Sequence, residues 1–109
     1  MSNRIQKINE VIKSYINDIL LKNLSLKSGV FLTISKVDTT SDLSYTRVFV
    51  SIYPEKEINY GLKTLEKEIY RIQGHLNQKL RIKKNPKIEF HLDDTESRAD
   101  KIEKLLQEI

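Results

Sequence analysis

The sequence of 109 residues contains no cysteine and no tryptophan, and it has only two prolines and three glycines. Without cysteine the chain can form neither a disulfide nor a thiolate metal site, and it has no catalytic thiol. No stretch approaches the ~18 consecutive apolar residues of a membrane-spanning helix. The N-terminus also lacks the apolar run of a secretory signal, so a cytoplasmic protein is the expectation.

Enzyme motifs are missing as well. There is no glycine-rich phosphate loop, no nucleophile elbow and no HExxH run. His75 and His91 fall on different predicted elements, without carboxylates at metal-ligand spacing. Asp38, Asp42 and the acidic pair at 93–94 fall where a turn and a helix cap explain them. The sequence therefore predicts no enzyme, no metal and no cofactor.

Positive charge is concentrated in one part of the chain. The protein has 19 basic and 15 acidic residues and a net charge of +4. The stretch 71–88 contains no acid and six basic residues: Arg71, Lys79, Arg81, Lys83, Lys84 and Lys87. Such a concentrated positive field attracts phosphate, which indicates a nucleic-acid surface. The alternative is a solvated face that keeps the protein soluble.

The first half of the chain predicts a helix followed by a hairpin. Isoleucines at helical spacing indicate an amphipathic helix over 3–22. Alternating residues predict a strand over 30–37, with Val30, Leu32 and Ile34 on its buried face. A second predicted strand, 45–53, buries Val48, Val50 and Ile52 on one face. The polar residues 38–42 between these strands have turn chemistry, so the two should pair antiparallel.

The second half predicts helices around one more strand. After Pro54 the apolar stripe has helical spacing from about residue 59 to Leu80, and it runs through Gly74. We expect two short helices joined by a kink at Gly74, because glycine disfavours a helix interior. A third strand should span 87–93, and a final helix 96–109 would carry Ile102, Leu105, Leu106 and Ile109.

These elements predict an α+β fold of order α-β-β-α-α-β with an added C-terminal helix. The whole chain, 1–109, would be a single domain with its core in 1–95 and the extra helix at 96–109. A three-stranded sheet of this size would be covered by helices on one face. Phe31, Phe49 and Tyr53 would then lie on the other face near Arg47, where aromatic rings could stack unpaired bases. Partial burial of these rings is the favoured alternative.

Two groups of residues carry a family resemblance. Segment 34–51, ISKVDTTSDLSYTRVFVS, resembles the second-strand signature of the bacterial ribosome-binding factor A family. Gly74, the run 80–82 and the run 86–90 with Asp93 match the second half of that family at similar spacing. Two features depart from the pattern: Ile72 stands where alanine is usual, and 26–29 replaces the frequent Asp-Pro-Arg.

The resemblance implies a K-homology-like (type II) fold with a kinked helix pair, in which the kink falls on 72–74. It also implies a non-enzymatic maturation factor, monomeric and without cofactor, that binds the immature small (30S) ribosomal subunit and 16S rRNA. Such a factor supports late maturation and processing of the rRNA 5′ end, and it matters most in the cold.

The predicted RNA-binding residues combine the basic stretch with two cations of the first helix. They are Arg71, Gly74, His75, Lys79, Arg81, Lys83, Lys84 and Lys87, with Arg4 and Lys7. Two alternatives of a different kind stay open: a generic K-homology-like RNA-binding module, and a protein-interaction module using the sheet face with Phe31 and Phe49. A small enzyme would need a convergent polar pocket, for which the sequence offers no nucleophile–base pair.

Overall fold

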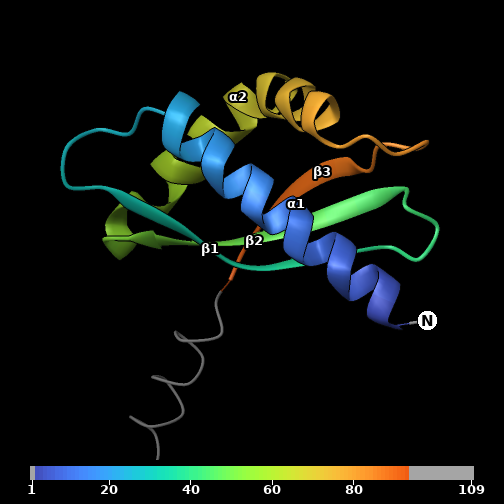
Figure 1. Ribbon diagram of the computed structural model, residues 1–109. Helices are drawn as coiled ribbons and strands as arrows, with labels where there is room; N and C mark the ends of the chain where they lie inside the picture. Colours follow the sequence, from blue (N-terminus) through green and yellow to red (C-terminus); the bar gives the residue numbers. More distant parts are fainter. Residues whose placement is uncertain (1, 94–109) are drawn as a thin grey trace, which may run out of the picture.

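Two long helices cover one face of a three-stranded sheet in the computed structural model, which describes residues 2–93 (Figure 1). The elements in chain order are α1 (Ser2–Asn23), β1 (Phe31–Thr39), β2 (Tyr45–Tyr53), the 3-10 turn η1 (Glu55–Glu57), α2 (Ile58–Lys79) and β3 (Lys87–Leu92). The strand order is β1-β2-β3, with β1 antiparallel and β3 parallel to β2. The predicted final helix, 96–109, lies outside the described residues.

The first helix forms where the spacing of its isoleucines predicts it. Ile12, Ile16 and Ile19 are fully buried against the sheet, and the other faces of α1 are mostly polar, with Val11 and Leu21 exposed. No helix in the described part of the chain is long and apolar enough to cross a membrane. The predicted helix over 3–22 is confirmed.

The hairpin differs from its prediction by one inserted residue. Ile34 pairs with Val50, but the next pair joins Lys36 to Phe49, so Ser35 forms a β-bulge. The bulge shifts the alternation, and as a result Val37 and Thr39 are buried. The strand therefore runs to Thr39 rather than to residue 37, and the turn follows it instead of occupying 38–42.

The second strand has the predicted bounds and the predicted buried face. Val48, Val50 and Ile52 are buried, and Thr46 continues the same face. Its hydroxyl lies 2.9 Å from that of Thr39 on the neighbouring strand. Each of these two buried hydroxyls thereby satisfies the other, as burial of a polar group requires.

The prediction of two separate helices meeting at Gly74 is wrong, because α2 is a single helix from Ile58 to Lys79. Gly74 is exposed, and an added Cβ would meet no atom within 4 Å. A glycine in a helix costs only about 1 kcal/mol relative to alanine. Burial of Ile72 and Leu76 on either side of it contributes more than that, so the helix continues.

The approach of α2 to the sheet depends on a different glycine. A Cβ at Gly61 would lie 2.7 Å from Cδ1 of Ile52 on β2. Glycine therefore lets the start of the helix lie directly on the strand. From there α2 crosses to β3, whose predicted inward residues Ile88, Phe90 and Leu92 are buried or half-buried.

Candidate nucleic-acid interface

Two adjoining hollows lie between α2 and the edge strand β3, and they share Ile69, Lys87 and Ile88 as lining residues. The smaller hollow has a volume of about 330 Å³ and is also lined by Tyr70, Gln73, Asn77 and Asn85. The larger one, of about 630 Å³, continues along β3 and is lined further by Leu62, Glu66, Glu89, Phe90 and His91. Together they form a groove, which we call the α2–β3 groove.

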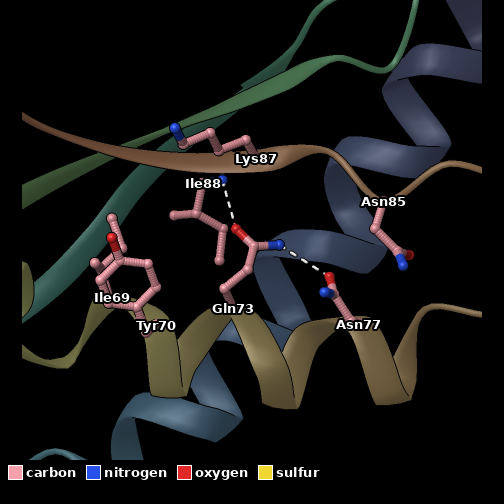
Figure 2. A pocket seen from close by; sticks show the side chains of 7 residues that line it. All are labelled: Ile69, Tyr70, Gln73, Asn77, Asn85, Lys87 and Ile88. Atoms are coloured by element: carbon pink, nitrogen blue, oxygen red, sulfur yellow. Dashed lines mark hydrogen bonds between the residues drawn. The ribbon is translucent and has the colours of Figure 1, made fainter.

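The side chain of Gln73 joins the two walls of this groove. Its Oε1 accepts a hydrogen bond from the backbone N–H of Ile88 at 2.8 Å, and its Nε2 donates to the carbonyl of Pro86 at 3.0 Å. The same Nε2 donates to Oδ1 of Asn77 at 2.9 Å, one turn further along α2 (Figure 2). Gln73 thus pairs with β3 much as a neighbouring strand would, and it sets the width of the groove.

The two ends of the groove differ in charge. Among residues 2–93 no acidic side chain lines the smaller hollow, whose polar residues besides Lys87 contribute three amides and the Tyr70 hydroxyl. Tyr70 is 89% exposed, and Ile69 and Tyr70 lie at one end of this hollow while Asn85 lies at the other (Figure 2). Glu66 and Glu89 line the larger hollow. Repulsion between carboxylates and phosphate favours the smaller hollow for an anionic ligand.

The turn between β1 and β2 holds the chain that leads into β3. The Thr40 hydroxyl donates to Oδ1 of Asp42 at 2.8 Å, and that carboxylate also accepts the backbone N–H of Ser44 at 3.1 Å. These hydrogen bonds from Thr40 and Ser44 lower the pKa of Asp42 to about 2. In turn, Ser44 accepts Lys84 Nζ on its hydroxyl at 3.0 Å and the Lys87 N–H on its carbonyl at 2.9 Å.

Part of the predicted basic surface gathers around this turn. Arg81, Lys83 and Lys84 are exposed in the loop between α2 and β3, and Lys84 is held by Ser44. The backbone of Lys87 lines the groove, but its ammonium points away from α2 on the far side of the strand (Figure 2). Arg81, Lys83 and Lys84 therefore lie in the loop at the Asn85 end of the groove, whereas the ammonium of Lys87 does not border it.

The rest of the basic stretch lies elsewhere on α2. Arg71, His75 and Lys79 follow one another at four-residue spacing, about half a turn around the helix from the groove-lining positions. Lys79 faces α1, where its Nζ lies 3.3 Å from Asp18 and 5.5 Å from the centre of the Tyr15 ring. Hydrogen bonds from Lys22 and Lys79 lower the pKa of Asp18. Within the described chain, the acid-free window thus divides between two sides of α2.

The remaining predicted residues are placed as follows. Arg71 is exposed, and its Nη1 lies 3.5 Å from Oε2 of Glu68. His75 is half-buried, and Gly74 is exposed within the helix. Arg4 and Lys7 are exposed on the first two turns of α1. The start of α1, the β1–β2 turn and the loop after α2 all lie toward one end of the molecule, at the right of Figure 1.

Sequence reasoning missed the uncharged residues of the groove. Tyr70, Gln73, Asn77 and Asn85 were not predicted because they are uncharged, and Gln73 was placed only in the expected kink at 72–74. A usable signal was present: Tyr70, Gln73 and Asn77 recur at three- and four-residue spacing, which places them on one side of a helix. Among residues 2–93 no group of three or more histidine, cysteine or acidic side chains could hold a metal ion.

The connectivity α-β-β-α-β, with two helices on one face of a three-stranded sheet and a groove beside the edge strand, is that of a K-homology-like domain. A sequence profile described as "Ribosome-binding factor A" matches residues 4–106. The chain therefore belongs to the ribosome-binding factor A family.

Individual relatives agree with this membership. The chain is 36% identical over 107 residues to the ribosome-binding factor A of Natranaerobius thermophilus, covering 97% of this chain and 82% of that protein. It is 31% identical over 109 residues to the Flavobacterium psychrophilum protein of that name, covering 96% and 84%.

Solved structures of the family share the fold. The crystal structure of ribosome-binding factor A from Thermus thermophilus matches with a TM-score of 0.69 at 20% identity, over 81% of this chain and 93% of that one. A homology model of the Thermus thermophilus protein, fitted into a cryo-electron-microscopy map of a 30S–RbfA complex, matches with a TM-score of 0.66 at 22% identity. That match covers 79% of this chain and 91% of the other.

Proposed function

We propose that this protein is a ribosome assembly factor that binds the immature small (30S) ribosomal subunit through 16S rRNA. Family membership supports this role, and so does the homology model of the Thermus thermophilus relative that was fitted into the map of a 30S–RbfA complex. By the same reasoning it acts late in maturation, supports processing of the rRNA 5′ end and matters most in the cold. It works as a cytoplasmic monomer without a cofactor.

The observation that carries the proposal is the acid-free hollow of the α2–β3 groove. Its floor is apolar at Ile69 and Ile88, and its rim carries amides and the exposed ring of Tyr70. Unpaired bases stack on aromatic rings and form hydrogen bonds with amides, whereas paired bases cannot enter such a hollow. A single-stranded segment of 16S rRNA is therefore the ligand that fits best.

Phosphate contacts come from the cations that border the Asn85 end of the groove. Arg81, Lys83 and Lys84 are exposed, and the Ser44 contact limits the positions that Lys84 can take. Backbone contacts of this kind need positive charge but no base-specific geometry. Arg4 and Lys7 extend the surface at the same end of the molecule, while Lys79 contributes less because Asp18 neutralises it.

Charge reversal at Lys83 and Lys84 tests this interface. With about four phosphates contacted, log K should fall against log salt with a slope of about −3. The Lys83→Glu/Lys84→Glu variant should bind immature subunits more weakly, with the slope reduced to about −1.5. A matched control is Lys56→Glu/Lys63→Glu, which changes the net charge equally at exposed positions around the start of α2. Co-sedimentation with immature subunits at low and high salt measures the binding of both double variants, and circular dichroism checks that each variant is folded.

Three outcomes would contradict the proposal. If both double variants lose binding equally, only net charge matters and the groove end has no special role. If Lys83→Glu/Lys84→Glu binds normally, the basic loop is not the contact. If the wild type binds mature and immature subunits equally well, the protein is a generic RNA-binding module rather than an assembly factor.

A further inference from the structure

The outer edge of β3 presents backbone groups that no strand of the described chain pairs. The N–H groups of Lys87 and Asp93 donate to carbonyls on the β2 side, at 2.9 and 2.8 Å. Because β3 is parallel to β2, the intervening Ile88 and Phe90 direct their N–H and C=O groups to the opposite side. Ile88 N–H donates there to Gln73 at 2.8 Å. Within residues 2–93, the Ile88 carbonyl and both backbone groups of Phe90 have no such partner.

This open edge faces the larger hollow of the α2–β3 groove. Gln73 bonds to the beginning of β3, and the hollow of about 630 Å³ continues along the strand as far as His91. Its other wall is one side of α2, formed by Leu62, Glu66 and Ile69. A space between a helix and an unpaired strand edge suits an extended polypeptide, whose main chain completes the ladder while alternate side chains contact the wall.

The charged groups of the larger hollow favour a basic ligand. Glu66 is exposed on the α2 wall and has no ion-pair partner among residues 2–93. Lys87 lines the hollow too, but its ammonium points to the far side of the strand (Figure 2). Glu89 adds a carboxylate that lies 4.0 Å from Arg47 and 3.2 Å from His91. Carboxylates repel phosphate and attract lysine and arginine, so a basic polypeptide fits this hollow better than a nucleic acid does.

The strand edge is distinct from the open face of the sheet, where the sequence suggested a protein contact. On that face the expected partial burial holds for Phe49, which lies 5.6 Å from His91 between ring centres. It is wrong for Phe31 and Tyr53, which are 64% and 70% exposed. The inference below uses only the edge of β3 and the facing side of α2.

We propose that an extended, basic segment of another protein binds along the outer edge of β3 as an additional strand. The Phe90 N–H and C=O exchange two hydrogen bonds with one residue of that segment, as in an antiparallel pair, and a basic side chain lies beside Glu66. Gln73 already occupies the Ile88 N–H, so the added strand ends there and leaves the smaller hollow accessible. The inference goes beyond the proposed function, since it adds a protein partner and does not require RNA in the groove.

Hydrogen exchange of single backbone amides in the full-length protein tests this contact. The probe is a synthetic octapeptide of alternating valine and arginine. At saturation it should slow exchange of the Phe90 amide about ten-fold and leave the Ile88 amide unchanged, because Gln73 already protects the latter. Two control peptides should protect neither amide. One has glutamate in place of arginine, and the other is fully N-methylated and therefore keeps the charge without backbone donors.

A pair of variants tests the charge. Glu66→Gln should weaken binding of the arginine peptide about three-fold, as expected for an exposed ion pair. The matched control is Glu68→Gln on the same helix, where the carboxylate lies 3.5 Å from Arg71 instead of lining the hollow. This control should bind the peptide like the wild type. Lys83→Glu/Lys84→Glu should retain peptide binding as well, which separates this contact from the rRNA contact.

Four results would overturn the inference. If the Phe90 amide exchanges slowly without peptide, the edge is already covered. If the arginine and glutamate peptides protect it equally, or the N-methylated peptide protects it as well, neither the charge nor the backbone pairing is used. If Glu66→Gln and Glu68→Gln weaken binding equally, the hollow is not the site. If oligouridylate protects the Phe90 amide and the arginine peptide does not, the edge binds nucleic acid instead of protein.

Discussion

Replacing Gly74 with alanine should stabilise the protein by about 1 kcal/mol, the difference between the two residues in an exposed helix interior. The magnitude follows from the structure because Gly74 is exposed within α2, and an added Cβ meets no atom within 4 Å. No steric clash of the added methyl group therefore offsets the gain in helix propensity. For a domain of this size the melting temperature should rise by roughly 4–8 °C.

Gly61→Ala provides the matched control, since both glycines lie in the same helix. A Cβ at Gly61 would come within 2.7 Å of Cδ1, 3.1 Å of Cγ2 and 3.2 Å of Cγ1 of Ile52. Overpacking of this kind typically costs about 1–3 kcal/mol, which exceeds or cancels the propensity gain. Gly74→Ala should therefore raise the free energy of unfolding, whereas Gly61→Ala should lower it or leave it nearly unchanged.

Urea unfolding followed by far-ultraviolet circular dichroism measures both variants, with the slope m expected to stay constant. A Gly74→Ala protein less stable than the wild type would contradict the open, regular helical position of residue 74 on which the expected gain depends. Binding to immature subunits should be unchanged by Gly74→Ala. Weakened binding with raised stability would show that binding requires a glycine at residue 74, as a contact or as a point of bending.

Two further substitutions test buried and exposed polar groups of the hairpin. Thr46→Val leaves the Thr39 hydroxyl buried without its partner at 2.9 Å and should cost about 1–3 kcal/mol, whereas the double Thr39→Val/Thr46→Val variant should cost less than the sum of the single changes. Additive losses in denaturant unfolding would contradict that coupling. Asp42 has a folded pKa of about 2 against an ordinary 3.8, so its stabilising contribution is complete above about pH 4 and is lost as the pH falls toward 2. The stability difference between wild type and Asp42→Asn should accordingly close over that range, and a constant difference would rule the explanation out.

Periodicity predicted the helices and strands well because each element has one buried face. The bounds of β2 and the buried residues Val48, Val50 and Ile52 follow directly from alternation. The bulge at Ser35 could not be predicted, since it depends on the register with β2, where Lys36 pairs with Phe49 and the Ser35 hydroxyl donates to the Phe49 carbonyl fourteen residues away. Two separate helices were predicted wrongly because the low helix propensity of Gly74 is outweighed by the burial of Ile72 and Leu76, which the sequence does not show directly.

The candidate interface was only partly predictable for a related reason. Counting charges along the chain finds the basic stretch, but the packing of α2 between α1 and β3 decides which side each residue faces. Lys79 is directed to Asp18 on α1, whereas Tyr70 and Gln73 face β3. Lys87 reaches the far side of the sheet because side chains alternate along a strand.

The fold also explains why two separate stretches of the family resemblance occur together. One is centred on Asp42 and Leu43 in the hairpin, and the other covers the loop and strand after α2. They meet at Ser44, which Asp42 holds by its backbone N–H at 3.1 Å and which binds both Lys84 and the backbone of Lys87. Leu43 takes the left-handed conformation, with φ of 61°, that this turn requires. The hairpin turn therefore holds the loop that carries Lys84 in place. A substitution that disrupts this turn should displace that loop although no basic residue is changed.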